Sequence, residues 1–367
     1  MKRVLFLTNY AAPYRVHFFD ALGKCMDVTV LFSDPVEAVT HRSQEWFEKG
    51  EGGFRAVQLK NSRFSMNDEN LCLDVISWLN QPYDAIVLSG YASPTVMLAM
   101  AYLKLRRIPF YMEIDGGLIR QESKPKHMLK QLLVSSANWW ISTGKYPTDF
   151  LVHYGAKRDR VSLYPFSSLF EKDIAKEVTT ASEKEALRQS LGIAEKKMVL
   201  SIGQFIHRKA FDILLQSAAS LDADTGIYIV GGDPTEEYQR LCQELNLKNV
   251  HFLSFMKKEK LVQYYRAADL FALPTREDIW GLVINEAMAY GLPVVTTDKC
   301  VAGLELVEDG VNGYIIPTEN SEILADRIRK VLQADTARMG SESLKKIRNY
   351  TIENMVKAHI QIFEKQN

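Results

Sequence analysis

Three carboxylates stand at a chemically useful spacing within residues 274–295. Glu277 and Asp278 precede Gly281, and Glu286 follows eight residues after Asp278. Eight helical residues turn through about 800°, so an unbroken helix would hold Asp278 and Glu286 about 80° apart. Gly281 more naturally marks a junction between a loop and a helix, which puts Asp278 on the loop and Glu286 on the helix. In that arrangement the two carboxylates can face one cleft.

The start of that helix offers backbone donors to an anion. The N–H groups of Gly281, Leu282 and Val283 lack partners within the helix, and the helix dipole favours negative charge there. These groups can bind a pyrophosphate, while Glu286, further along the helix, can accept hydrogen bonds from a diol such as that of ribose. The alternative is an ordinary surface helix with a stabilising acidic first turn.

A second polar cluster follows an apolar strand that begins at Met198. The loop after this strand contains Gln204, His207, Arg208 and Lys209, and an amphipathic helix comes next. Open parallel sheets present ligands at the carboxyl ends of their strands, where such loops lie. Arg208 and Lys209 can therefore neutralise a nucleoside diphosphate, the first as a fork and the second as a point charge. Taken alone, a solvated basic loop explains this cluster better, but the acidic segment weakens that alternative.

The segments between the two clusters have an informative order. They are a strand that ends in a double glycine at 231–232, a helix from Glu236, a strand at 249–253, a helix at 257–267 and a strand at 269–274. This order resembles the C-terminal half of the retaining glycosyltransferases of family 4, which have the GT-B fold. The resemblance covers residues 196–320 closely and the remainder more loosely. It implies a nucleotide-sugar donor as substrate and no cofactor.

On the diphosphate side, the resemblance assigns roles residue by residue. Lys209 matches the family lysine that holds the donor diphosphate. The family arginine five residues earlier is replaced by Gln204, and Arg208 is the candidate substitute. No D-x-D motif lies near a strand end, so we expect side chains and helix N–H groups, without a metal, to meet the diphosphate charge.

On the sugar side, the resemblance concerns a motif of paired glutamates. Glu286 matches the second glutamate, which holds the donor ribose. The first glutamate, near the donor sugar, corresponds to Asp278, which is one methylene shorter, and Glu277 is a rival for that role. Because charge develops at the sugar during transfer, Asp278 is a candidate catalytic residue.

Composition and length set the frame for these sites. A chain of 367 residues exceeds a single core, and 47% hydrophobic with 25% charged residues is typical of globular proteins. The balance of 45 basic and 45 acidic residues gives no drive toward nucleic acid. The four scattered cysteines indicate neither a zinc site nor a disulfide framework and favour a cytoplasmic setting. No apolar run approaches the ~20 residues that span a bilayer.

Strands and helices also alternate in the N-terminal half. We expect strands at 4–8, 28–33, 85–89, 108–114, 139–142 and 161–164, and helices at 14–24, 70–79, 94–104 and 126–136. This alternation predicts a parallel sheet covered on both faces. The chain is therefore expected to be an α/β protein of the GT-B type, with two Rossmann-like domains that face an interdomain cleft.

The predicted domains are an acceptor-binding domain at 1–168, a nucleotide-sugar-binding domain at 169–345 and a final helix at 346–367 that packs back on the first domain. A linker is expected near 165–184, where a capping box at Ser182 and Glu185 starts a helix that Gly192 ends. Apolar residues follow a helical spacing from Ile352 to Phe363. His359 lies on or beside that apolar face, where a structural role is expected.

The acceptor side is less defined. Glu113 and Asp115 lie at the carboxyl end of a predicted strand, and strand alternation puts them on the same side. Either carboxylate can deprotonate an acceptor hydroxyl. An acidic turn, in which Gly116 and Gly117 simply allow tight geometry, explains the segment nearly as well.

A basic segment, Arg120 to Lys130, precedes apolar residues that continue to Val134. A basic amphipathic helix can lie on an anionic membrane, although a charge cluster is usually only a solvated face. Since many relatives glycosylate lipid-linked acceptors, we expect a glycan or lipid-linked acceptor and contact with the inner face of the membrane.

The sequence thus predicts a retaining, metal-independent glycosyltransferase of cell-surface polysaccharide or glycolipid synthesis. A nucleotide-sugar epimerase of the same fold would use the same donor pocket without an acceptor. A non-catalytic membrane-surface module would keep the basic segment but would tolerate loss of Lys209 and Glu286.

Overall fold

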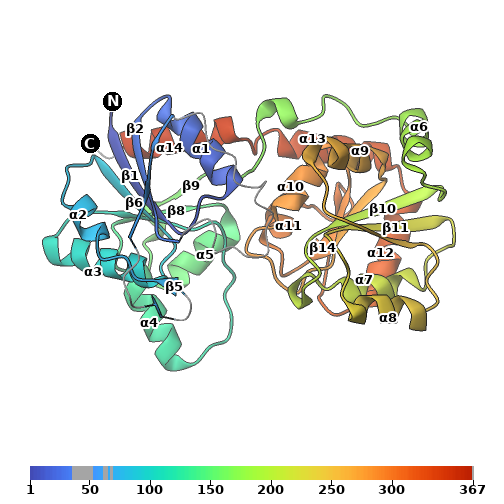
Figure 1. Cartoon of the computed structure of the whole chain (residues 1–367), viewed down its shortest axis with the longest axis horizontal. Helices are drawn as coiled ribbons and strands as arrows, with labels where there is room; N and C mark the ends of the chain where they lie inside the picture. Colours follow the sequence, from blue (N-terminus) through green and yellow to red (C-terminus); the bar gives the residue numbers. More distant parts are fainter. Residues whose placement is uncertain (35–52, 61–64, 67–68, 366–367) are drawn as a thin grey trace. The chain divides into compact units, whose positions relative to one another are not determined.

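The computed structural model describes residues 1–34, 53–60, 65–66 and 69–365, which belong to two compact units (Figure 1). Unit 1 contains Met1–Ser168 and Thr351–Asn367, and unit 2 contains Leu169–Tyr350. The chain therefore leaves unit 1 once and returns to it for the last helix.

Unit 1 is built on a parallel sheet of seven described strands in the order β3-β2-β1-β6-β7-β8-β9. The strands are β1 (Arg3–Thr8), β2 (Asp27–Phe32), β3 (Arg55–Gln58), β6 (Ala85–Ser89), β7 (Tyr111–Glu113), β8 (Trp139–Ser142) and β9 (Val161–Leu163). A separate antiparallel pair is formed by β4 (Ser65–Met66) and β5 (Glu69–Asn70). Because the seven strands are parallel, all of their carboxyl ends lie at one edge of the sheet.

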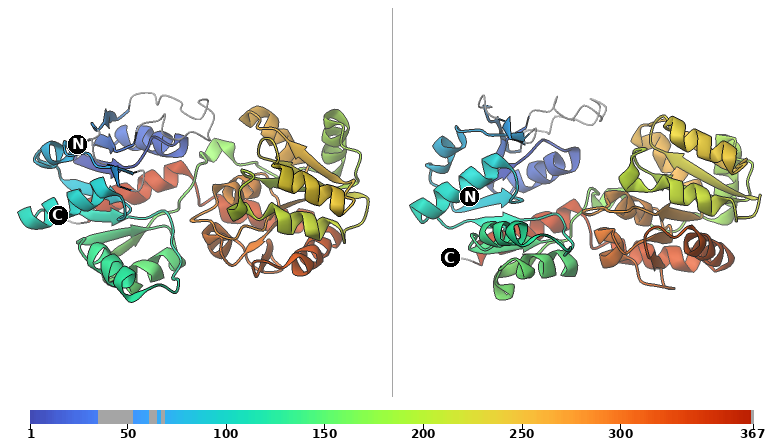
Figure 2. Two further views of the ribbon diagram at one scale, coloured as in Figure 1. Left: turned by 60° about the horizontal axis from the view of Figure 1, so that its bottom comes forward. Right: turned by 90° about the horizontal axis from the view of Figure 1, so that it is seen from below.

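Helices cover both faces of this sheet, as expected for parallel strands. They are α1 (Pro13–Gly23), α2 (Val75–Leu79), α3 (Pro94–Arg106), α4 (Lys124–Val134), α5 (Lys145–His153) and α14 (Ile352–Glu364), with the 3-10 turn η3 (Arg158–Arg160). Leu5 and Leu7 pack in a core with α2, α3 and α5, whereas Phe6, between them in β1, packs against Phe18 of α1 and Phe363 of α14. Two further views show α14 next to α1 in unit 1 (Figure 2).

Charged side chains meet at the α14 side of this sheet. Arg15 of α1 donates to Glu113 at 3.2 Å and to both oxygens of Asp115 at 2.6 and 2.7 Å. His359 of α14 approaches Glu113 at 3.1 Å through Nε2 and the Met355 carbonyl at 2.8 Å through Nδ1. Arg15, Glu113 and His359 are all buried, so these polar side chains depend on one another for their hydrogen bonds.

Unit 2 contains a second parallel sheet, of six described strands in the order β12-β11-β10-β13-β14-β15. The strands are β10 (Lys197–Ile202), β11 (Thr225–Val230), β12 (Val250–Leu253), β13 (Leu270–Leu273), β14 (Val294–Thr297) and β15 (Gly313–Ile316). The chain runs outward from β10 to β12 and then crosses to β13 on the other side of β10. The strand order therefore reverses between β10 and β13, where such sheets form a ligand crevice.

The helices of unit 2 form two layers about its sheet. They are α6 (Ala181–Leu191), α7 (Phe211–Ala218), α8 (Glu236–Glu244), α9 (Lys258–Ala267), α10 (Leu282–Ala289), α11 (Val301–Leu306), α12 (Ser321–Gln333) and α13 (Thr336–Ile347), with the turns η4 (Glu171–Asp173) and η5 (His207–Lys209). Helices α7, α8 and α12 share one core with alternate residues of the strands. Helix α6 packs against α9, and α10 packs against α13.

The predicted α/β class with two Rossmann-like sheets is confirmed, and some local predictions are wrong. The capping box is formed by Thr180 and Glu183 instead of the predicted Ser182 and Glu185. The two pairs have the same spacing in the sequence. Ser182 lies inside α6, which Gly192 does end in the left-handed conformation. Strand β7 is shorter than the predicted 108–114, and α5 and β3 were not predicted. On α14, the helical spacing predicts Ile360 on the apolar face, but Ile362 is buried and Ile360 only half-buried.

The buried network of unit 1 makes its stability depend on pH. Burial alone raises the pKa of Glu113, but the His359 hydrogen bond and the Arg15 guanidinium lower it to about 2, below the ordinary 4.5. We expect Glu113→Gln to destabilise unit 1 by roughly 3–5 kcal/mol at pH 7, since the buried Arg15 and His359 lose the carboxylate that both contact. Because a lowered folded pKa stabilises only above the unfolded value, the difference from wild type should shrink as the pH falls from 4.5 toward 2.

Urea denaturation of both proteins across this pH range checks the prediction. Asp149→Asn is the matched control, because the Asp149–Arg158 pair is exposed and should be worth less than about 1 kcal/mol. A gap between Glu113→Gln and wild type that does not change with pH would contradict the ionised, paired state of Glu113.

Candidate functional site

The predicted donor residues gather at the carboxyl edge of the unit 2 sheet. Strand β10 leads into the loop that contains η5, β13 leads into residues 274–281, and β14 leads into residues 298–300. Backbone bonds join these loops: the Arg276 N–H donates to the Arg208 carbonyl, and the Asp278 N–H donates to the Lys299 carbonyl. The two clusters recognised in the sequence are thus parts of one site, at the point where the strand order reverses.

Glycines let the backbones at this edge approach closely. A Cβ atom on Gly231 would lie 1.8 Å from the carbonyl oxygen of Gly203, an overlap that no side chain permits. A Cβ atom on Gly203 would lie 3.3 Å from the side chain of Lys209, so the lysine stem runs directly over that glycine. The close approach therefore fixes the path of Lys209 toward the site.

The ammonium of Lys209 meets the carboxylate of Asp278. Lys209 Nζ lies 2.5 Å from Asp278 Oδ2, and Arg208 Nη1 lies 3.3 Å from Asp278 Oδ1. The side chains of Lys209 and Asp278 are each only 12% exposed, so this ion pair is largely shielded from water. The structure thus brings the predicted phosphate-binding cations and the predicted sugar-side carboxylate into direct contact, which the sequence did not suggest.

Helix α10 begins where the sequence predicts it. Gly281 has φ 102°, a left-handed conformation that suits glycine, and a Cβ atom there would lie 2.7 Å from the sulfur of Cys300. Leu282 and Val283 open the helix and are half-buried. The helix therefore presents its first N–H groups, with their positive partial charge, at the same edge as Lys209.

Glu286 lies one turn into α10 and has a fixed orientation. The Tyr265 hydroxyl donates to Glu286 Oε2 at 2.9 Å, and the Tyr265 ring stacks on Tyr290 with centroids 5.3 Å apart. Burial, followed by the charge of Glu286, raises the pKa of Tyr265 well above its ordinary value, so the phenol keeps its proton. The Tyr265 phenol thereby orients the Glu286 carboxyl group, whose oxygens can accept hydrogen bonds from a diol.

Glu277 and Gln204 have different surroundings from their neighbours. The Glu277 carbonyl accepts hydrogen bonds from Arg208 at 2.8 Å and from the Thr275 hydroxyl at 2.9 Å, which fixes the loop backbone. Of the two adjacent acids, Asp278 is the one whose carboxylate pairs with Lys209. Gln204 is exposed directly after β10.

In unit 1, the predicted acceptor-side acids are both engaged by Arg15. Glu113 is 1% exposed, and its lowered pKa makes it a poor base, so its surroundings indicate a structural role. Asp115 is partly exposed at the carboxyl edge of the sheet and also accepts from the Tyr164 hydroxyl at 3.0 Å. Of the two, Asp115 is better placed to meet a ligand.

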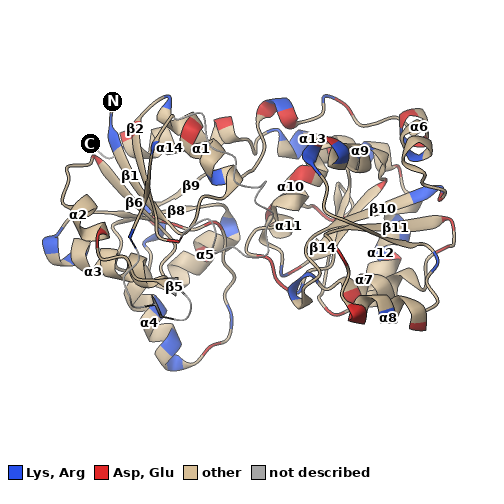
Figure 3. Cartoon of the chain, viewed as in Figure 1, with Lys and Arg blue, Asp and Glu red and all other residues tan. Residues whose placement is uncertain are grey.

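The basic segment forms the start of α4 and the loop before it. Glu122 draws Lys130 inward to 2.6 Å and also accepts from the Tyr154 hydroxyl. Lys124 and Lys126 of α4 are exposed. Figure 3 marks the Lys and Arg positions along α4 and the loop before it in blue. Large apolar side chains are exposed beside them: Ile119 (50%), Met128 (67%), Leu129 (48%) and Leu132 (69%).

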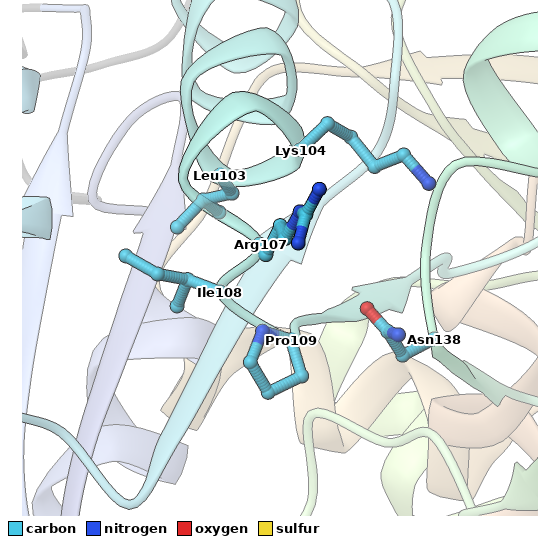
Figure 4. Close-up of a pocket in the computed structure, with 6 residues that line it drawn as sticks. All are labelled: Leu103, Lys104, Arg107, Ile108, Pro109 and Asn138. Carbon is cyan, nitrogen blue, oxygen red and sulfur yellow. The ribbon is translucent and has the colours of Figure 1, made fainter.

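Two surface hollows lie away from these residues. One, of about 230 Å³, lies at the amino edge of the unit 1 sheet, where Lys104, Arg107 and Asn138 surround it together with Leu103, Ile108 and Pro109 (Figure 4). The other, of about 780 Å³, lies in unit 2 between residues 172–180, α9 and Tyr290. Neither is lined by a predicted donor-binding residue.

Two features of the described part of the chain concern metals and membranes. Its His, Cys, Asp and Glu side chains do not gather in threes that could hold a metal ion. Its helices are all too short or too polar to cross a membrane.

Sequence comparisons agree with the arrangement of unit 2. Residues 183–354 match the family model described as glycosyl transferases group 1. The chain is 30% identical over 248 residues to the D-inositol 3-phosphate glycosyltransferase of Corynebacterium efficiens, covering 63% of this chain and 57% of that protein. It is 28% identical over 210 residues to the lipopolysaccharide glucosyltransferase WaaG of Escherichia coli, covering 56% and 55%. The matches thus span little more than half the length of these relatives.

Structural comparison extends the likeness to the whole chain. HepE from Anabaena, solved in complex with UDP-glucose, superposes with a TM-score of 0.73 at 20% identity, covering 100% of this chain and 99% of that one. At this identity the superposition establishes the fold, which is that of the GT-B glycosyltransferases. Residues 183–354, a little under half of the chain, are thus similar to the glycosyl transferases group 1 family.

Proposed function

We propose that this protein is a glycosyltransferase that moves a hexose-type sugar from a nucleoside diphosphate to an acceptor hydroxyl, with retention of configuration and without a metal. The observation that carries the proposal is the convergence of Lys209, Arg208, Asp278 and the start of α10 at one sheet edge, with Glu286 one turn further on. Cations and N–H groups suit a diphosphate, and an oriented carboxylate suits a ribose.

The donor diphosphate binds the positive charges of Lys209 and Arg208, which pair with Asp278 in the structure. Its oxygens accept from Lys209, Arg208 and the N–H groups of Gly281, Leu282 and Val283. The bond from the anomeric carbon to the diphosphate oxygen breaks, and the electron pair leaves with the diphosphate. The acceptor oxygen attacks the same face of the sugar, and its proton passes to the departing oxygen. Positive charge held at the diphosphate stabilises this step.

Unit 1 supplies the acceptor side in this proposal, and a lipid-linked acceptor fits its surface. Met128, Leu129 and Leu132 share one exposed face of α4, next to exposed Lys124 and Lys126. Apolar side chains beside lysines match the interior and the charge of an anionic bilayer. We place the enzyme at the inner face of the membrane, in the synthesis of cell-surface polysaccharide or glycolipid.

Loss of the Lys209 ammonium should remove one preorganised contact to the diphosphate. We expect Lys209→Ala to lower transfer about a hundredfold or more, the scale of one such contact at roughly 2.7–4 kcal/mol. Lys345→Ala, which removes an exposed lysine of α13, should behave as wild type. Initial rates with UDP-, GDP- and ADP-sugars, measured in EDTA, test both points. Unchanged turnover in Lys209→Ala would refute the phosphate role, and strict dependence on added magnesium or manganese would refute metal independence.

The acidic residues should separate in steady-state kinetics. Glu286→Gln should mainly raise the donor KM, because ribose contacts persist from ground state to transition state. Asp278→Asn should mainly lower kcat, because charge develops near the transferred sugar. Glu277→Gln keeps the backbone carbonyl that accepts from Arg208 and Thr275, so it should change little. A dead Glu277→Gln beside a near-normal Asp278→Asn would reverse the assignment of the first carboxylate.

The proposed membrane contact predicts binding to anionic vesicles. Replacing Leu129 and Leu132 together by serine should weaken co-sedimentation with phosphatidylglycerol vesicles, since both side chains are exposed and available to insert. Leu163→Ser, at an equally exposed leucine of β9, should have no effect. Equal binding of all three proteins, or equal binding to purely zwitterionic vesicles, would exclude this surface as the contact.

A further inference from the structure

The side chain of Arg276, in the loop after β13, has no role in the site as described so far, yet it makes a dense set of contacts. Its guanidinium forms a fork with Asp212, at 2.9 Å to Oδ1 and 2.6 Å to Oδ2. A second carboxylate, Glu319, accepts from Nε at 2.5 Å and from Nη2 at 3.0 Å. The Arg276 side chain is only 16% exposed. It is thus a charged group held in one position from two sides.

The same guanidinium reaches the loop that carries the cations. Arg276 Nη1 donates to the His207 carbonyl at 2.7 Å, and the Arg276 backbone N–H donates to the Arg208 carbonyl at 2.9 Å. The Thr275 hydroxyl donates to the Arg208 carbonyl as well, at 2.8 Å. Two successive carbonyls of η5 are therefore fixed immediately before Lys209.

The loop that contains η5 ends in a strained backbone conformation, which needs contacts to maintain it. Ala210, the next residue, has φ 54°, a left-handed conformation that is strained for a residue with a Cβ atom. Such strain persists only where the surroundings enforce it. The bonds from Arg276 and Thr275 supply that constraint, and they keep Lys209 Nζ at the edge where α10 begins.

We infer that Arg276 is a positioning residue for the nucleoside diphosphate site. It acts through the backbone of His207–Lys209 rather than by touching the ligand. Its loss would free the η5 loop and leave Asp212 and Glu319 without their shared cation, close to an anionic ligand. The inference rests on the proposed function, because the ligand in question is the diphosphate of the sugar donor.

Arg276→Gln tests the inference by titration calorimetry with UDP, GDP and ADP, each compared with its monophosphate. For whichever diphosphate binds the wild type, we expect affinity to fall about tenfold to a hundredfold, the scale of losing one charged hydrogen bond. Affinity for the monophosphate should change much less, since ribose and base contacts remain. Arg276→Lys keeps the charge but loses the fork, so it should recover only part of the affinity.

Arg188→Gln is the matched control. Arg188 is 11% exposed and pairs with Asp269 at 2.5 Å, but it anchors α6 near the start of β13 rather than the η5 loop. Both variants should lower thermal stability, and only Arg276→Gln should weaken diphosphate binding at a temperature where all proteins are folded. Should Arg276→Gln not fold, Asp212→Asn removes the fork from the other side and should give the same selective loss.

The outcomes separate the two claims. If the wild type binds no nucleoside diphosphate, the proposed function fails. If the wild type binds one and Arg276→Gln binds it equally well, or if Arg188→Gln loses as much affinity, the positioning role fails while the proposed function stands.

Discussion

The ion pair between Lys209 and Asp278 is the interaction on which the site of unit 2 depends. It joins the loop after β10 to the loop after β13, at a separation of 2.5 Å and with little exposure to water. A buried charge is tolerated only with a partner, so neither residue can move without the other or a substitute. A diphosphate is such a substitute, because its oxygens can replace the carboxylate beside the ammonium. The pair therefore keeps a cation ready at the edge of the sheet where α10 begins.

In unit 1, too, side chains of opposite charge pair at the carboxyl edge of the sheet. Arg15 engages Glu113 and Asp115, and His359 adds a contact from the last helix. Here the pairing is more complete and more deeply buried, which makes Glu113 a structural anion and leaves Asp115 as the more accessible carboxylate. Helix α14 is thus held on unit 1 by the contact of His359 with Glu113 as well as by the apolar face of the helix.

Local sequence patterns predict the individual strands, helices and turns. They do not predict contacts between residues that are distant in the sequence. Apolar runs and their alternation with amphipathic segments suffice for the parallel strands and for the junction at Gly281. Two overlapping capping-box patterns, at Thr180 and Ser182, have the same spacing in the sequence, and the structure forms the first. The pairing of Lys209 with Asp278 links residues 69 positions apart, which no local pattern encodes. Arg276 was missed for the same reason: its partners, Asp212 and Glu319, come from distant segments.

The most direct test of the central claim is a crystal structure of the full chain with the nucleoside diphosphate that it binds. The account predicts the diphosphate at the start of α10, within hydrogen-bonding distance of Lys209 Nζ, with the ribose hydroxyls on Glu286. It also predicts that phosphate oxygens take over contacts that Asp278 now makes to Lys209 and Arg208. A nucleotide bound elsewhere in unit 2, such as the hollow beside Tyr290, with the Lys209–Asp278 pair unchanged, would contradict the account.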